Sequence, residues 1–188
     1  METTRDKLIN ATFDEVFSHG YQGASLADIL AKAGVHKGSM YHFFANKKEM
    51  ALAAIEEKIL KKNAEKYRYV ETCTSGFLEE FYRQLRDTSV RDFKRGCPIA
   101  NVVQEMSNID EDFNTLMKSI YGAFRANIKA ILDKAIEVGE MKACDTTKLA
   151  LFITSTIEGA ILSAKATGNA QDYVDVIEEL IEHIEGKR

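Results

Sequence analysis

Basic, hydroxyl and aromatic side chains gather without any acid in the segment 36–48, HKGSMYHFFANKK. Lysine neutralises phosphates, hydroxyl and imidazole groups bond to phosphates or base edges, and glycine permits a close backbone approach. With one serine upstream, the residues that could do this are Ser25, His36, Lys37, Gly38, Ser39, Tyr41, His42 and Lys47. Their types and spacing predict a surface that binds double-stranded DNA.

The uneven distribution of charge is compatible with such a partner, although the net charge of the chain is −4. Residues 1–68 carry 11 basic and 9 acidic residues, whereas residues 69–188 carry 14 and 20. Between Asp28 and Glu49 there is no acid. A positive segment of this kind can meet a polyanion. The alternative is a solvated charged face on a small helical bundle, with Tyr41 and Phe43 as partial core.

The elements that must position these residues are predicted to be helices, because helix formers are frequent, proline occurs once and no alternating β-branched run suggests a sheet. We expect an all-α fold of about nine helices. Their predicted spans are 3–19, 25–34, 36–44, 47–67, 77–85, 98–106, 113–138, 145–166 and 170–184. A helix that ends at Gly34 and another that follows after a short turn form a helix-turn-helix. In the second of these, Met40 and Phe44 share the face expected to be buried.

Residues 5–52 resemble the N-terminal domain of the TetR family of transcriptional regulators through the string SLADILAKAGVHKGSMYHFFANKKEM. The resemblance implies a helix-turn-helix DNA-binding domain in residues 1–47 and a ligand-binding and dimerisation domain in residues 48–188, connected by the helix at about 47–67. His36 departs from the family, which more often has a small hydroxyl residue there, and its role is not assigned. Two shorter pieces, GCPIANVVQEMS and EGAILSAKATG, are similar to the branch with NemR-like and LmrA/YxaF-like regulators.

The same resemblance implies a second site, for a small-molecule effector, in the C-terminal two thirds. The candidate lining residues are Phe77, Phe81, Cys97, Asn101, Met106, Phe113, Met117, Tyr121, Phe124, Phe152 and Glu158, with Arg125 as a further polar anchor. A stripe at helical spacing also describes an ordinary core, which remains the alternative. Cys97, between Gly96 and Pro98 at a helix start that favours a thiolate, is either a reactive sensor or a structural turn residue.

The family architecture further implies a homodimer in which the last two helices of each chain form a four-helix bundle. The residues expected at this interface are Phe152, Gly159, Ala160, Ser163, Tyr173, Ile177, Leu180 and Ile184. The alternative is that both helices complete the core of a monomer.

Other classes of protein have little support in the sequence. It contains no glycine-rich phosphate loop, no metal-spaced histidines and acids and no nucleophile motif, so we expect no catalytic residue, metal or cofactor. Small helical enzyme and helical adaptor are the other classes considered. Three distant cysteines suggest reduced thiols, and the absence of a signal segment or 18 uninterrupted apolar residues predicts a cytoplasmic protein without a membrane partner. The sequence therefore predicts a ligand-responsive, homodimeric DNA-binding regulator, most simply a repressor that an apolar or electrophilic effector releases from a pseudo-palindromic operator.

Overall fold

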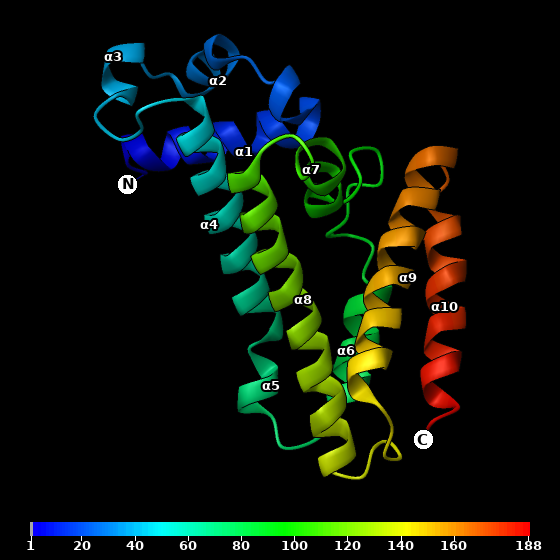
Figure 1. The fold of residues 1–188 in the computed structure, drawn as a ribbon. Helices are drawn as coiled ribbons and strands as arrows, with labels where there is room; N and C mark the ends of the chain where they lie inside the picture. Colours follow the sequence, from blue (N-terminus) through cyan, green and yellow to red (C-terminus); the bar gives the residue numbers. More distant parts are fainter. Residues whose placement is uncertain (1) are drawn as a thin grey trace. The chain divides into compact units, whose positions relative to one another are not determined.

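The structure, a computed structural model that describes residues 2–188, is helical throughout its regular parts (Figure 1). The helices are α1 (Thr4–Gly23), α2 (Leu26–Ala33), α3 (Lys37–Met40), α4 (Lys47–Tyr67), α5 (Tyr69–Thr72), α6 (Phe77–Arg86), α7 (Pro98–Met106), α8 (Glu111–Glu137), α9 (Thr146–Thr167) and α10 (Gln171–Glu185). The predicted all-α fold is confirmed. The helix that the sequence did not predict is α5, a single turn after α4.

The chain forms two compact units. The first comprises the chain up to Lys62 together with Pro98–Ile120, and the second comprises Asn63–Cys97 and Tyr121–Arg188. Helices α4 and α8 are long enough to contribute to both units. Helix α7 and the first turns of α8 therefore belong with the N-terminal helices, although they lie far along the sequence. The functional division at residue 47 remains a prediction.

In the first unit, α1 packs against both α2 and α7. The Thr3 side chain begins α1 by accepting the Asp6 N–H, and the Asp6 carboxylate accepts the Thr3 N–H in return. Regular helix ends at Gly20, as predicted, where φ is 77° and ψ is 166°, and one further turn follows. Gly34 ends α2 in the left-handed conformation, with φ of 64° and ψ of 36°. This glycine turn lets α3 start three residues later.

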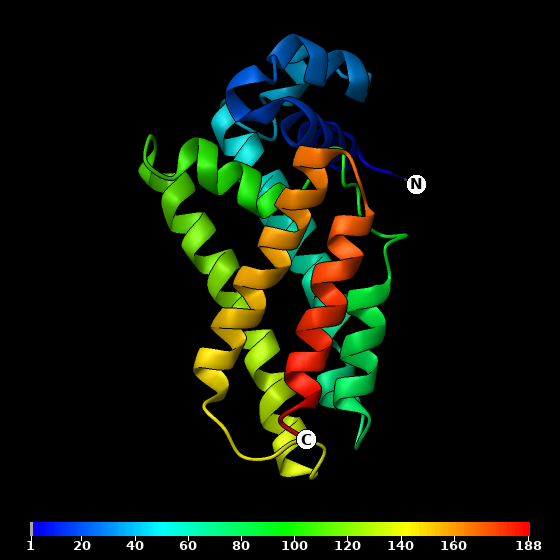
Figure 2. The same ribbon diagram turned by 90° about the vertical axis from the view of Figure 1, so that its right-hand side faces the viewer.

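In the second unit, α10 packs along α9 and also contacts α6 (Figure 2). The largest fully buried side chain is Tyr173, whose hydroxyl donates to the carbonyl of Leu85 at 2.8 Å. Among residues 2–188, α9 is the one helix that is long and apolar enough to cross a membrane by composition. One side of α9 nevertheless lies in the core of this unit, with Ile153, Ile157 and Ala164 buried. Helix α9 is therefore a core helix.

Candidate DNA interface and effector site

The segment after Gly34 forms a short recognition element. Backbone hydrogen bonds continue the turn of α3 beyond its last residue, because the N–H groups of Phe43 and Phe44 both donate to the Met40 carbonyl, at 2.9 and 3.0 Å. Met40 and Phe44 are buried, with 0% and 3% exposure, as predicted from their spacing. We call residues 37–44 the recognition segment. Because Met40 and Phe44, its two apolar anchors, point into the core, the side chains on the opposite side of the segment point away from it.

The outward side of the recognition segment carries the side chains that the sequence singled out. Lys37, Gly38, Tyr41 and His42 are exposed and Ser39 is half-buried. Within residues 2–188 the Lys37 ammonium makes no ion pair, so it is available to a partner. The structure brings these five residues together on one short element, and their contacts with DNA remain a prediction.

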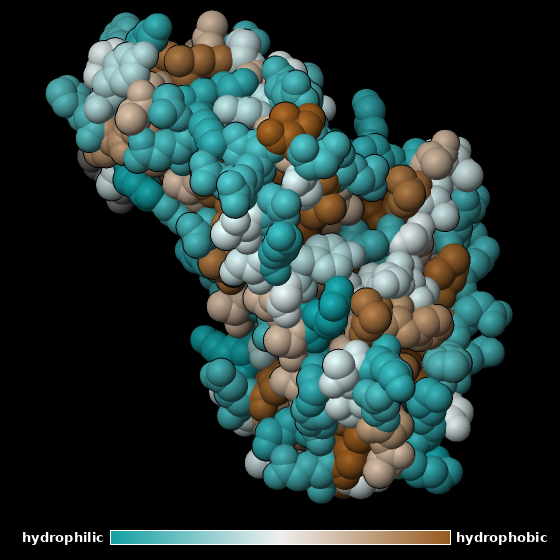
Figure 3. Space-filling view, in the orientation of Figure 1, coloured by the Kyte–Doolittle hydropathy of each residue, from teal (hydrophilic) through white to brown (hydrophobic). Residues whose placement is uncertain are grey.

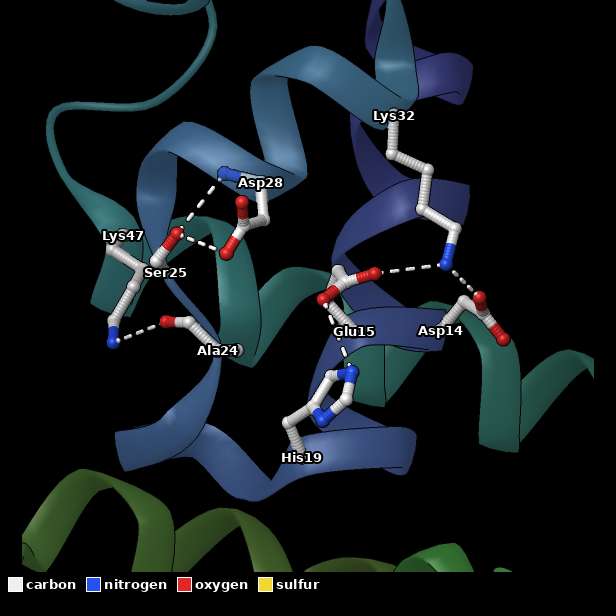
Figure 4. A network of polar contacts seen from close by, with 8 residues as sticks. All are labelled: Asp14, Glu15, His19, Ala24, Ser25, Asp28, Lys32 and Lys47. Carbon is white, nitrogen blue, oxygen red and sulfur yellow. Dashed lines mark hydrogen bonds and ion pairs between the residues drawn. The ribbon is translucent and has the colours of Figure 1, made fainter.

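Two other predicted contact residues lie at helix starts. Ser25 precedes α2, where its Oγ accepts the Asp28 N–H at 3.0 Å and its hydroxyl donates to the Asp28 carboxylate at 2.6 Å (Figure 4). His36 precedes α3 without a side-chain capping bond, as its departure from the family pattern suggested. Ser25 therefore has a structural task as a cap in addition to its predicted contact, whereas the His36 side chain is exposed and serves no capping role.

Three lysines of the acid-free window, residues 29–48, bind side chains or backbone carbonyls from other parts of the first unit. Lys32 pairs with Asp14 and, at 2.8 Å, with Glu15 on α1 (Figure 4). The two α1 carboxylates raise the pKa of this lysine through hydrogen bonds. The pairing reduces the positive charge that Lys32 presents to a polyanion.

Lys48 is engaged by acids outside the window. Its ammonium lies 2.6 Å from carboxylate oxygens of both Asp110 and Asp112, at the start of α8. The hydrogen bonds that the Lys48 ammonium donates to these carboxylates raise its pKa. Acids from another part of the sequence therefore lie beside this segment, and among the lysines between Asp28 and Glu49, Lys37 is the one with neither an ion pair nor a hydrogen bond within residues 2–188.

Lys47 holds the last turn of α1, Tyr21–Ala24, which we call the α1 terminal turn. Its Nζ donates to the carbonyl oxygens of Tyr21 and Ala24 at 2.8 and 2.9 Å and lies 4.4 Å from the centre of the Tyr21 ring. At the other end of the turn, the Glu105 carboxylate on α7 accepts the N–H groups of Tyr21 and Gln22 at 2.8 and 2.9 Å. The two charged side chains cap the turn from opposite ends. A phosphate contact by Lys47 would use its remaining N–H.

The sequence did not predict the contacts of Glu105 or the packing between Tyr21 and Phe113. The rings of Tyr21 and Phe113 have centres 4.6 Å apart, so Phe113 supports the α1 terminal turn. A Cβ at Gly20 would lie 2.7 Å from a Glu105 carboxylate oxygen. The signal for Glu105 was its position as the one charged residue of the helix PIANVVQEM.

The candidate effector residues fall into different surroundings. Asn101, Met106, Phe113 and Met117 belong to the first unit, and the others to the second. Phe77 and Phe81 are buried in the core of the second unit, with the Phe124 ring 6.4 Å from that of Tyr67. Phe152 lies apart from these core residues: it is 46% exposed on α9, and the centre of its ring is 5.0 Å from that of His183. Its lining role stays a prediction.

Three of the candidates form a polar cluster with Arg125 in the second unit. The Cys97 thiol donates to Glu158 Oε1 at 3.3 Å, and the Arg125 guanidinium lies 5.9 Å from the centre of the Tyr121 ring. Burial raises the pKa of Glu158, and burial together with the charge of Glu158 raises the pKa of Tyr121 to about 12. Among the described residues, Glu158 Oε2 and Arg125 Nε are buried without a hydrogen-bond partner. Such atoms are costly unless water or a ligand satisfies them.

The predicted dimer interface needs a correction. Ala160, Tyr173, Ile177, Leu180 and Ile184 are at most 2% exposed in the single chain. Their side chains fill the core of the second unit, because they lie on the sides of α9 and α10 that face inward, and cannot supply surface to a partner.

The other predicted interface residues lie on the outer side of α9. Phe152, Gly159 and Ser163 are exposed there, and Leu151 and Leu162 lie near them with 45% and 54% exposure. Apolar side chains reach the surface in the region of α9 in Figure 3. The outer face of α9 therefore exposes three large apolar side chains, those of Leu151, Phe152 and Leu162.

Comparisons with known proteins agree with this arrangement. A family model described as bacterial regulatory proteins of the tetR family matches residues 8–54, and one described as a tetracyclin repressor-like C-terminal domain matches residues 77–180. The transcriptional regulator AcuR of Cereibacter sphaeroides is 30% identical over 170 residues, which cover 84% of this chain and 74% of that protein.

Solved structures show the same fold. A TetR-family regulator from Cytophaga hutchinsonii superimposes with a TM-score of 0.85 at 26% identity, covering 98% of this chain and 94% of that one. Reduced NemR of Escherichia coli gives a TM-score of 0.86 at 20% identity, covering 96% of each chain. The chain belongs to the TetR family of bacterial transcription regulators, which bind DNA and are not enzymes.

Proposed function

We propose that the protein is a cytoplasmic, homodimeric repressor that binds a pseudo-palindromic operator through the recognition segment and leaves it when a small apolar or electrophilic molecule binds the second unit. The observation that carries the DNA-binding part is the exposed side of the recognition segment, with an unpaired Lys37 above buried Met40 and Phe44. An element of this shape fits the major groove, where lysine meets guanine acceptors and Ser39 meets base edges.

The test of DNA binding is enrichment of bound duplexes from a random pool, followed by affinity measurements at several salt concentrations. We expect a two-fold symmetric motif, because a dimer presents two recognition segments to two half-sites. Affinity should fall steeply as salt rises, since lysine contacts release phosphate counterions. An affinity that does not change with salt concentration, or an enriched DNA motif without two-fold symmetry, would contradict the proposal.

The proposed dimer uses the outer face of α9. Leu151, Phe152 and Leu162 are large apolar residues at the surface, and the exposed Gly159 lies between them in sequence. A small residue at that position allows two helices to approach closely, while the larger side chains supply apolar area. Exposed apolar surface of this kind commonly marks a protein interface.

The proposed effector site is the polar cluster of Cys97, Tyr121, Arg125 and Glu158. A ligand that offers hydrogen bonds to Glu158 Oε2 and Arg125 Nε would satisfy two buried atoms that the protein leaves unpaired. The buried aromatic residues of the second unit would supply apolar contact. The test is a small-molecule panel scored by release of operator DNA, with Glu158→Gln and Arg125→Gln expected to weaken release. Unchanged release in both variants would place the effector elsewhere.

A thiol-based sensor is the second candidate, because Cys97 directly precedes α7 and the N-terminal end of a helix stabilises a thiolate. Cys73 and Cys144 are exposed, whereas Cys97 is half-buried in the polar cluster. In a Cys73→Ser, Cys144→Ser background, N-ethylmaleimide should alkylate Cys97 and release operator DNA. The additional replacement Cys97→Ser is the matched control. Alkylation of Cys97 without release of DNA would reject the sensor role and leave the reversible effector site standing.

A further inference from the structure

Phe43 is an apolar side chain exposed in the middle of the proposed DNA interface. It is 42% exposed, although the alternative interpretation of the sequence counted it as partial core. Its N–H donates to the Met40 carbonyl at 2.9 Å, which fixes its backbone as a continuation of α3. The ring has no polar atom with which to bind a phosphate or a base edge.

The position of Phe43 in the recognition segment places it beside the predicted base-reading residues. It follows Ser39 by four residues, and residues four apart share a side of a helical turn. The anchors Met40 and Phe44 point into the first unit, so Ser39 and Phe43 flank them on the outward side. The charge of the surroundings suits DNA, because residues 29–48 contain no acid and Lys37 is unpaired.

DNA offers one apolar group in the major groove, the C5-methyl group of thymine. We propose that Phe43 packs against a thymine methyl group in each half-site and makes that operator position specific for thymine. This inference rests on the proposed function, since it requires the recognition segment to enter the major groove. It adds an apolar reading residue to the polar contacts expected of Lys37 and Ser39.

The experiment uses the full-length protein and the operator obtained by enrichment from random duplexes. Each thymine is replaced in turn by deoxyuridine, which removes only the methyl group, and affinities are measured for the wild type and for Phe43→Ala. In the wild type we expect one symmetry-related pair of thymines at which deoxyuridine weakens binding by about fourfold per half-site, the effect of one methyl group leaving water. In Phe43→Ala the same replacement should have no effect.

Two further variants make the outcome unambiguous. Phe43→Leu retains an apolar side chain and should retain part of the sensitivity to the methyl group. Tyr41→Phe, which leaves Phe43 in place, should retain all of it. Melting temperatures of the variants should match that of the wild type, because Phe43 is exposed and its truncation creates no cavity.

Three results would overturn the inference in distinguishable ways. If Phe43→Ala weakens binding to all operators equally, with no dependence on thymine methyl groups, the ring contacts deoxyribose instead. If deoxyuridine weakens the wild type and Phe43→Ala to the same extent, another residue reads the methyl group. If the wild type enriches no duplex from the random pool, the proposed function itself fails and the inference fails with it.

Discussion

Replacement of Gly20 by alanine should destabilise the first unit strongly. The glycine has φ of 77° and ψ of 166°, a conformation that residues with a Cβ rarely adopt. In addition, the new Cβ would lie 2.7 and 2.9 Å from the two carboxylate oxygens of Glu105. Either the backbone keeps its strained conformation and displaces Glu105, or the α1 terminal turn moves.

The magnitude follows from these two effects. Holding a non-glycine residue in this region costs about 1–3 kcal/mol. Displacing the Glu105 carboxylate removes the hydrogen bonds that it accepts from the N–H groups of Tyr21 and Gln22. A hydrogen bond to an ionised acceptor contributes about 1.5–3 kcal/mol, and less where water can replace the acceptor. Because the Gln22 bond is exposed, we expect a total loss of about 3–5 kcal/mol in the free energy of unfolding.

The assay is urea unfolding followed by far-ultraviolet circular dichroism, with Gly38→Ala as the matched control. Gly38 lies in α3 without positive φ, and a Cβ there would meet nothing within 4 Å, so alanine should be neutral or slightly stabilising. Once Gly20→Ala is present, Glu105→Ala should cost little more, because the carboxylate has already been displaced. Equal stability of Gly20→Ala and Gly38→Ala, or additive losses in the double variant, would refute the reasoning.

Three other predictions concern single side chains. Lys37→Met should reduce the difference in binding free energy between the preferred base and the other bases by roughly 1–3 kcal/mol, without changing the melting temperature. Lys47→Met should weaken binding to all DNA sequences alike. It should also lower the melting temperature, because Lys47 holds the α1 terminal turn. Phe152→Glu should produce monomers in sedimentation experiments, and Val90→Glu, at an exposed apolar position outside α9, should not. Since burial raises the pKa of Glu158, the stability that this group contributes is present while its side chain is neutral and is lost as pH rises through the raised pKa. Glu158→Gln, which stays neutral, should therefore lose less melting temperature than the wild type as pH rises above the ordinary range of a glutamate.

Local signals predicted the recognition segment well. The spacing of Met40 and Phe44 identified its buried side, and Gly34 identified the turn before it, because both depend on neighbours within a few residues. The same holds for Asn46, whose side chain accepts the Glu49 N–H at 2.9 Å as its position before α4 suggested. Hydrophobic periodicity and helix capping depend on residues close together in the sequence, so they can be predicted from it directly.

Contacts between distant segments were not predictable in this way. The acid-free window suggested a uniformly positive surface, yet Lys48 meets Asp110 and Asp112, which are about 60 residues away in sequence. Similarly, the apolar stripe of α10 was compatible with either a dimer interface or a core, and burial of Ile177 shows that it is core. The spacing of hydrophobic residues indicates that one face of a helix is buried. It does not indicate whether the same chain or a partner chain packs against that face.

The capping of the α1 terminal turn limits how the regulator can be divided for engineering. A fragment that ends after α4 would lack Glu105, leaving two N–H groups of the turn without their carboxylate, and would lack Phe113, exposing one face of Tyr21. It would also leave Lys48 without Asp110 and Asp112. A chimera that joins the N-terminal helices α1–α4 to another sensor domain should therefore also contain α7 and the first turns of α8, so that two separate segments of this chain are transferred.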